Sequence, residues 1–247
     1  FLKNEEVLIK IVSSVEIDMN DLILEIGPGM GALTSYLVKK DISLLCYEID
    51  ERMQPFLKKF EGEKCKIIYD DFLKRNIVDD IKKIPFQNLY VVANIPYYIT
   101  SPIIVKLIEM EEKPKEIVLL VQKEFAERIV ASAGHKEYNA FTLFVDIEYE
   151  AELLFLVDRN QFFPVPNVDS AVIKLTRKEK IDILNKEKYL RFIRDAFSNK
   201  RKTLRNNLKE YDWEKLKNIL EKLGYKENVR AEEINKEDFK KLVNQYE

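Results

Sequence analysis

The chain has 247 residues, 46% hydrophobic and 34% charged, with six Gly and eight Pro, a composition that excludes collagen-like, low-complexity and wholly disordered proteins. Its formal net charge of −2 is unevenly divided, because residues 177–247 hold 20 basic and 14 acidic residues whereas residues 1–176 hold 21 and 29. No apolar run approaches the roughly 18 to 20 residues of a membrane span, and the two cysteines lack disulfide or zinc spacing. We therefore expect a globular, cytoplasmic protein without a metal, built as one large domain with a small basic appendage.

The first three quarters of the chain alternate between predicted strands and helices. Apolar residues at helical spacing predict a helix within 5–15, and short apolar runs then predict buried strands at 22–26, 43–47, 66–69, 89–93 and 116–121. Amphipathic stretches at 32–40, 51–60, 101–110 and 123–131 separate or follow these strands. This alternation predicts a mostly parallel sheet covered by helices on both faces. Two further runs, 141–149 and 170–176, flank a Pro-containing segment and predict an antiparallel pair that closes the sheet.

The rest of the chain is predicted to be helical. Periodicity indicates helices at 186–197, 200–209, 213–223 and 236–246, so we expect an α/β domain over 1–178 and a small all-helical domain over 179–247. The densest basic cluster, Lys200, Arg201, Lys202 and Arg205, contains no acidic residue. Such a cluster is a candidate phosphate-binding surface, with a solvated helix face as the alternative.

A glycine-rich loop follows the first predicted strand. Gly27, Gly29 and Gly31 are spaced by two residues between a strand and a helix, a GxGxG pattern that differs from the dinucleotide GxGxxG and is typical of S-adenosylmethionine loops. A merely tight strand-to-helix turn is the alternative.

Acidic residues end the next two predicted strands. Glu48 can accept hydrogen bonds from the two hydroxyl groups of a ribose, and Asp71 can accept a hydrogen bond from an adenine amino group. Asp70 competes with Asp71 for that role, and Glu48 could be an ordinary strand-end acid. Because ligands of open α/β sheets bind at the carboxyl ends of strands, these positions support one another.

The tetrapeptide Asn94-Ile95-Pro96-Tyr97 follows the fourth predicted strand and matches the Asn-x-Pro-Tyr pattern of amino-group methyltransferases. The amine of an aromatic base is a poor nucleophile because its lone pair is delocalised. The Asn94 side-chain oxygen and the Ile95 carbonyl can accept its two N–H protons and so direct the nitrogen at a methyl donor. Pro96 fixes the turn, and Tyr97 offers a face for a base flipped out of its stack. A strand-ending turn is the alternative.

Five stretches occur together in one order along the chain: EIGPGMGALT, NIPYYITSP, VQKEFAERI, FFPVPNVDSAVIKL and AFSNKRKTLRNNL. With them, nearly the whole chain resembles the KsgA-type ribosomal RNA adenine dimethyltransferases. The related Erm methylases of large-subunit RNA share the glycine loop, the tetrapeptide and the FxPxP segment. They lack the AFxxxRKTLRxxL stretch, which therefore favours the KsgA-type group.

The resemblance implies a Rossmann-like class I methyltransferase sheet with an antiparallel last strand. It further implies methylation by S-adenosylmethionine of the N6 atoms of two adjacent adenosines in small-subunit (16S) ribosomal RNA, in ribosome biogenesis. The implied partner is that RNA or a pre-30S particle, bound by a monomer. The cofactor contacts carried over are Leu2, Gly27, Glu48, Asp71 and Asn94, to which the glycine loop adds Gly29 and Gly31. The implied catalytic residues are Asn94, Pro96, Tyr97 and Phe162. Phe162 would close over the target adenine opposite Tyr97, with Phe163 as its competitor.

Three functions of different kinds remain open at this point. The first is dimethylation of small-subunit RNA, with Lys200, Arg201, Lys202 and Arg205 contacting the RNA. The second is an Erm-like methyltransferase of large-subunit RNA, or one acting on adenine in DNA. The third is a non-catalytic RNA-binding assembly factor, which the intact tetrapeptide and glycines argue against.

Overall fold

The computed structural model describes residues 2–246, which form two compact units. The first unit contains residues 2–126 and 152–177, and the second contains 127–151 and 178–246. The chain thus passes from the first unit to the second after residue 177, close to the predicted boundary at 178. It also passes to the second unit after residue 126 and returns to the first after residue 151. Segment 127–151 groups with the C-terminal helices because Tyr138, Leu143 and Ile147 belong to the same buried cluster as those helices.

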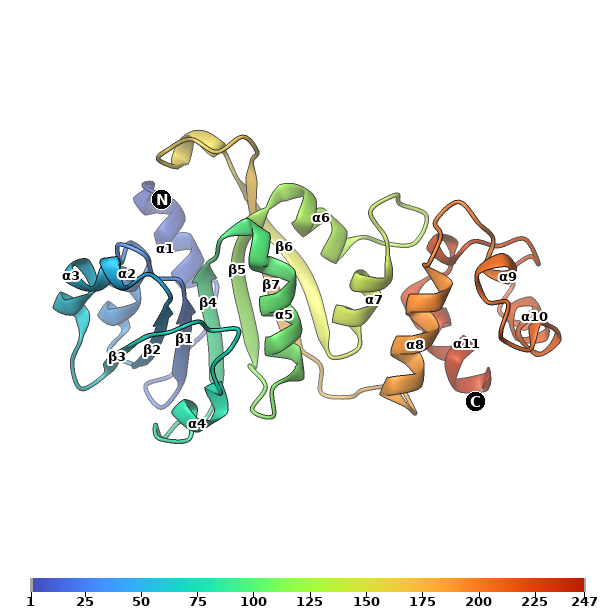
Figure 1. Cartoon of the computed structure of the whole chain (residues 1–247), viewed down its shortest axis with the longest axis horizontal. Helices are drawn as coiled ribbons and strands as arrows, with labels where there is room; N and C mark the ends of the chain where they lie inside the picture. The colour runs from blue at the N-terminus through green and yellow to red at the C-terminus, as the bar shows by residue number, and fades with distance from the viewer. Residues whose placement is uncertain (1, 247) are drawn as a thin grey trace. The chain divides into compact units, whose positions relative to one another are not determined.

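The first unit is built on a seven-stranded sheet (Figure 1). Its strands are β1 (Leu22–Ile26), β2 (Ser43–Glu48), β3 (Cys65–Tyr69), β4 (Leu89–Asn94), β5 (Glu116–Gln122), β6 (Tyr149–Val157) and β7 (Ser170–Arg177). Their order is β3-β2-β1-β4-β5-β7-β6, with β1 to β5 parallel and β7 antiparallel to β5. The predicted sheet, mostly parallel with an antiparallel strand after the fifth, is confirmed.

Helices cover both faces of this sheet, which explains why its central strands read as continuous apolar runs. All residues of β1 are buried, as are the central five of β5. The helices of this part are α1 (Glu5–Ser13), α2 (Thr34–Leu37), α3 (Gln54–Leu57), α4 (Ile77–Ile81) and α5 (Thr100–Glu109). Helix α6 (Lys123–Val130) begins in this unit and ends in the second. Apolar side chains of α1 and α2 pack against strand residues such as Ile23, Leu44 and Val92 in one buried cluster. Helix α4 is short and was not predicted.

The predicted strand at 141–149 is wrong. Residues Ala140–Asp146 form helix α7, and the strand is β6, which begins only at Tyr149. Asn139 caps α7 by accepting from the Phe141 N–H (2.8 Å), while its own N–H donates to the Thr142 hydroxyl (3.2 Å). Capping and burial against the second unit's core therefore outweigh the strand preference of the Phe, Thr and Val residues here.

The second unit adds α8 (Lys186–Ala196), α9 (Leu204–Asn207), α10 (Trp213–Lys222) and α11 (Lys236–Tyr246) to α7. Aromatic side chains of α8 and α11 form its centre, where the Phe192 and Phe239 rings lie 6.4 Å apart. Of the helix predicted over 200–209, only residues 204–207 are helical. Among residues 2–246, no helix is both long and apolar enough to cross a membrane.

Candidate functional site

A cavity of about 690 Å³ opens where the parallel strands of the first unit end. Its lining includes nine residues singled out from the sequence: Leu2, Gly27, Gly29, Glu48, Asp71, Asn94, Pro96, Tyr97 and Phe162. The carboxyl ends of neighbouring parallel strands meet at one edge of the sheet, which brings residues from distant parts of the chain together. Gly31 and the basic cluster do not line this cavity.

The Glu48 carboxylate is held beneath the glycine loop. Its Oε2 accepts a hydrogen bond from the Gly29 N–H (2.8 Å) and its Oε1 accepts from the Asp50 N–H (2.9 Å). The residue is only 5% exposed. A carboxylate has about four acceptor positions, so two remain for a ligand after these bonds. Glu48 is therefore both fixed in orientation and able to bind hydroxyl groups.

Gly31 does not line the cavity, and its lack of a side chain has a reason in packing. Its φ of +83° lies in the left-handed region, and a Cβ there would come within 2.4 Å of the Phe60 ring. The absence of a side chain thus lets the start of the helical segment after the loop pack against Phe60.

The structure distinguishes the two acids that follow β3. Asp70 is engaged by Arg75, whose Nη1 donates to Oδ2 (2.9 Å), and by the Asp71 N–H, which donates to Oδ1 (2.7 Å). Asp71 uses Oδ1 to accept from the Leu73 N–H (2.9 Å), and its Oδ2 has only the exposed Lys74 ammonium at 3.5 Å. Both acids line the cavity, but Asp71 has the freer carboxylate.

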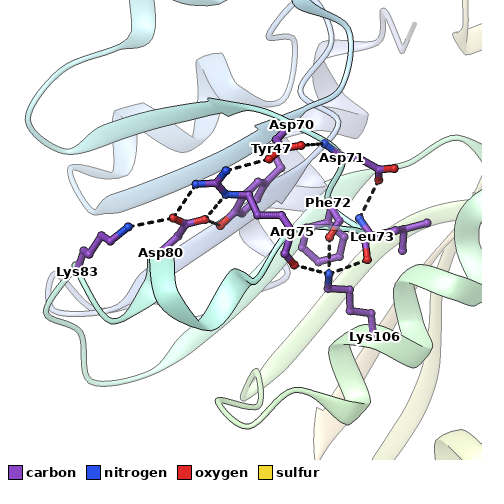
Figure 2. Close-up of polar contacts among 9 residues, drawn as sticks. All are labelled: Tyr47, Asp70, Asp71, Phe72, Leu73, Arg75, Asp80, Lys83 and Lys106. Carbon is purple, nitrogen blue, oxygen red and sulfur yellow. Dashed lines mark hydrogen bonds and ion pairs between the residues drawn. The ribbon is translucent and has the colours of Figure 1, made fainter.

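A charged network, of which only Asp70 lines the cavity, supports this loop (Figure 2). The Arg75 guanidinium binds Asp70 and also Asp80, whose carboxylate accepts from the Tyr47 hydroxyl (3.0 Å). Hydrogen bonds from Arg75 lower the pKa of both carboxyl groups, so both stay ionised and bound at neutral pH. The sequence did not point to this network.

The tetrapeptide turn lies beside the glycine loop. A Cβ on Gly27 would be 3.9 Å from Pro96 Cδ. Asn94 ends β4, and within residues 2–246 its side-chain amide has no hydrogen-bond partner, so it is available to a ligand. The Tyr97 hydroxyl lies 2.6 Å from the Ser170 hydroxyl, which is buried at the start of β7. Ser170 therefore holds the tyrosine ring in place, a contact that the sequence did not predict.

Leu2 and Phe162, which are 160 positions apart, form an antiparallel bridge. The Lys3 N–H donates to the Gln161 carbonyl (2.9 Å), and the Asn4 amide donates to the Gln161 side chain (2.6 Å). Phe162 is 8% exposed and lines the cavity. Phe163 is 60% exposed, does not line the cavity, and has the Lys3 ammonium 4.0 Å from its ring centroid. Of the two aromatic residues, Phe162 therefore reaches the site.

A second buried acid, Glu25, lines the cavity from the end of β1. It is 1% exposed and accepts a weak hydrogen bond from the Cys46 thiol (3.5 Å). Burial raises the pKa of Glu25 to about 7, and the negative charge of Glu48 adds to this effect. An acid at the start of the glycine loop was visible in the sequence, but only burial gives it an unusual pKa.

The charged residues that line the cavity are all acidic. It includes five acids, Glu25, Glu48, Asp50, Asp70 and Asp71, and no Lys, Arg or His among the described residues. In that same part of the chain, no three His, Cys, Asp or Glu side chains group as a metal site requires. Such a cavity suits a positively charged ligand that carries hydroxyl and amino groups.

The basic cluster lies in the second unit, with three of its residues on a turn that precedes α9 and Arg205 within α9. Lys200, Arg201 and Lys202 are exposed on this turn, which we call the basic turn. Asn199 Oδ1 accepts from the Arg201 N–H (3.1 Å), which orders the turn. Arg205 differs from these three residues, because its guanidinium pairs with Glu227 at 2.7 Å. Part of the charge predicted for RNA contact is thus already neutralised.

Comparisons with known proteins agree with one another. Residues 1–247 match the family model described as ribosomal RNA adenine dimethylase. Two relatives, each named ribosomal RNA small subunit methyltransferase A, come from Fusobacterium nucleatum (43% identical, covering 100% of this chain and 95% of the relative) and Mycoplasma mobile (40% identical, covering 98% and 93%).

Two solved structures also match over nearly the whole chain. A dimethyladenosine transferase from Plasmodium falciparum has a TM-score of 0.82 and 32% identity, with 100% of this chain and 97% of that chain covered. The 23S rRNA methyltransferase ErmE has a TM-score of 0.81 and 25% identity, with 99% and 98% covered. The predicted class I methyltransferase fold is therefore confirmed.

Proposed function

Because the chain belongs to the ribosomal RNA adenine dimethylase family, we propose that it transfers methyl groups from S-adenosylmethionine to the N6 atoms of two adjacent adenosines in small-subunit (16S) ribosomal RNA. The product is N6,N6-dimethyladenosine, and the reaction serves small-subunit biogenesis. The observation that carries the proposal is the single cavity in which acidic strand ends meet the Asn94–Tyr97 turn.

The acidic lining fits S-adenosylmethionine, which carries a sulfonium, an ammonium, a ribose and an adenine. Glu48 would accept from the ribose hydroxyls and Asp71 from the adenine amino group, with Leu2, Gly27 and Gly29 closing around the cofactor. When bound, the cofactor supplies an electrophilic methyl group.

The remaining steps belong to residues around the target base. The Asn94 side-chain oxygen and the Ile95 carbonyl accept the two N–H protons of the adenine amine, which localises its lone pair. Tyr97, held by Ser170 at 2.6 Å, offers a face for the flipped base, and Phe162 lies at the same cavity. Acceptors that are already in place at the transition state need not reorganise during the reaction. The amine attacks as its neutral form, and the methylated nitrogen then releases its extra proton to solvent, so no strong general base is required.

The small-subunit substrate is favoured over the large-subunit one by the relatives and by the sequence. The two relatives named for the small subunit are 43% and 40% identical, whereas ErmE is 25% identical. The stretch AFSNKRKTLRNNL, which includes the basic turn, is present here and absent from the Erm pattern. A monomeric state and a cytoplasmic location stay predictions.

A labelling experiment tests this function. The protein is incubated with methyl-labelled cofactor and, in parallel, with immature small subunits, large-subunit RNA or DNA. We expect label in the small-subunit RNA, recovered as N6,N6-dimethyladenosine after digestion. Label in large-subunit RNA or DNA would favour the alternative enzyme, and no label in any of the three would contradict the proposal.

Glu48→Ala is expected to weaken cofactor binding about ten-fold or more, because it removes the acceptor for two ribose hydroxyls. Glu48→Gln, which keeps one acceptor oxygen, should lose less. Isothermal calorimetry measures the affinity, and thermal melting shows whether the loop remains folded. The matched control is Glu51→Ala, which removes an exposed acid three residues away. Equal affinities for wild type and Glu48→Ala would refute the assignment.

We expect a weaker salt dependence of RNA binding when the three basic-turn residues Lys200, Arg201 and Lys202 are replaced with Gln. The slope of the logarithm of the RNA-binding constant against the logarithm of the salt concentration should fall in magnitude by about two to three units, since each residue is assigned one phosphate contact. Cofactor affinity should not change. Arg205→Gln should change the slope less, because Arg205 is paired with Glu227. A salt titration of binding to immature small subunits measures both.

The control for this prediction removes three exposed lysines of the first unit, Lys39, Lys40 and Lys66. If the control and the basic-turn variant give the same slope, the RNA surface lies elsewhere.

A further inference from the structure

Lys106 of helix α5 makes an unusual set of contacts. Its ammonium donates to three backbone carbonyl oxygens of one loop, those of Phe72 (2.6 Å), Leu73 (2.9 Å) and Arg75 (2.7 Å) (Figure 2). It also lies 5.2 Å from the centroid of the Phe72 ring. An ammonium has three N–H donors, so these carbonyls occupy all of them.

Three carbonyl oxygens that converge on one point repel each other unless a positive charge lies between them. Without the ammonium, each would lose a charge-assisted hydrogen bond in a half-buried place. The Lys106 ammonium therefore stabilises the folded shape of loop 70–75. Burial lowers the pKa of Lys106, and the nearby Asp71 charge opposes that effect.

The same loop carries the carboxylate assigned to the adenine amino group. Leu73 is the shared residue, because its N–H donates to Asp71 Oδ1 (2.9 Å) while its carbonyl accepts from Lys106. The Arg75 N–H donates to the Asp71 carbonyl (3.0 Å), and the Arg75 carbonyl accepts from Lys106. Any shift of these two residues would move the Asp71 side chain.

Helix α5 also contacts the Asn94–Tyr97 turn, which is assigned to the target base. It begins at Thr100, directly after the tetrapeptide turn, and the Thr100 hydroxyl donates to the Tyr97 carbonyl (3.1 Å). One continuous helix thus contacts the turn assigned to the target base at its first residue, and the loop assigned to the cofactor through Lys106.

We propose that Lys106 is a positioning residue that holds loop 70–75 in its binding conformation and sets the place of the Asp71 carboxylate relative to the Asn94–Tyr97 turn. The inference rests on the proposed function, since the role of Asp71 toward the cofactor comes from it. Lys106 does not line the cavity. It acts on the ligand only through the loop.

The first test measures S-adenosylmethionine affinity of the full chain by calorimetry, without RNA. Lys106→Met keeps the length of the side chain but donates no hydrogen bond, and we expect it to weaken binding about ten-fold. Lys106→Arg keeps the charge and should recover part of the loss. The matched control is Lys174→Met, which should leave affinity unchanged. The Lys174 ammonium donates to the Ser14 carbonyl (3.1 Å) and pairs with Glu116 (2.9 Å) in the first unit, and none of these three residues lines the cavity.

A double-mutant cycle separates positioning from general loss of stability. If Lys106 acts through Asp71, Lys106→Met should weaken binding little further in an Asp71→Ala protein. In a Glu48→Ala protein it should still cause its full loss of about ten-fold. The same loss in both backgrounds would overturn the inference, because a merely structural residue would affect both equally.

Hydrogen exchange of the amides at 72–75, measured without cofactor, keeps this result distinct from a failure of the proposed function. We expect exchange to be faster by about ten-fold or more in Lys106→Met than in Lys174→Met. Unchanged exchange would show that Lys106 does not hold the loop. Absence of cofactor binding by the wild-type chain would contradict the proposed function, and the exchange result would still decide the role of Lys106.

Discussion

Asn94→Ala is expected to lower the rate of methyl transfer by about a hundred-fold, the effect of removing one preorganised hydrogen-bonding partner from a reaction centre. The Asn94 amide has no partner within residues 2–246 and lines the cavity, so its oxygen is available to the target amine. Single-turnover labelling at saturating cofactor and RNA measures the chemical step. Cofactor affinity should fall by less than the rate, because the assigned ribose and adenine contacts come from Glu48 and Asp71.

The matched control is Asn88→Ala, at the residue directly before the other end of β4. The Asn88 amide donates to Asp21 (2.8 Å), far along β4 from the cavity, so this change should leave the rate of transfer unaltered. If Asn94→Ala reacts as fast as wild type, or if weaker cofactor binding accounts for its whole defect, the assigned role of Asn94 is wrong.

Glu25→Gln is expected to make the protein more stable above pH 7, by up to about 3 kcal/mol in the free energy of unfolding. In the native state burial raises the pKa of Glu25 to about 7, whereas the ordinary value is 4.5. Between these values the native state keeps a proton that the unfolded state has lost. The free energy of unfolding therefore falls as pH rises from about 4.5 to 7, and the neutral Gln removes this penalty.

Denaturant unfolding at pH 4.5, 6 and 8 checks this prediction. The two proteins should differ least at pH 4.5 and most at pH 8. Gln keeps an oxygen that can accept from the Cys46 thiol, so the packing change is small. Glu16→Gln, at an exposed acid, should follow the wild-type profile. Parallel profiles for wild type and Glu25→Gln would mean that Glu25 is ionised in the folded protein.

Much of the fold and several site residues could be predicted because their signals are local. Strands such as β1 and β5 are runs of apolar residues, since a central parallel strand is buried on both faces. The glycine loop, Glu48, Asp71 and the Asn94–Tyr97 turn each follow a strand directly. Parallel strands then bring these positions to one edge of the sheet. The cavity at that edge is where the sequence predicted a site.

Other features depend on contacts between distant segments, which a pattern along one stretch of chain does not contain. Segment 140–146 is helical because capping by Asn139 and the second unit's core outweigh the strand preference of its residues. The pairing of Leu2 with Phe162 joins the two chain segments of the first unit.

The choice between Asp70 and Asp71 was also decided by tertiary structure, because the Arg75 guanidinium binds the carboxylate of Asp70 and not that of Asp71. In the sequence, nothing distinguishes Lys106 from other lysines of a predicted helix, and only the structure places three backbone carbonyls around its ammonium. Residue types and their spacing therefore determined where this protein has a site and what chemistry it suits. The partners of each polar side chain, which set its orientation, charge state and availability to a ligand, were decided by the tertiary structure.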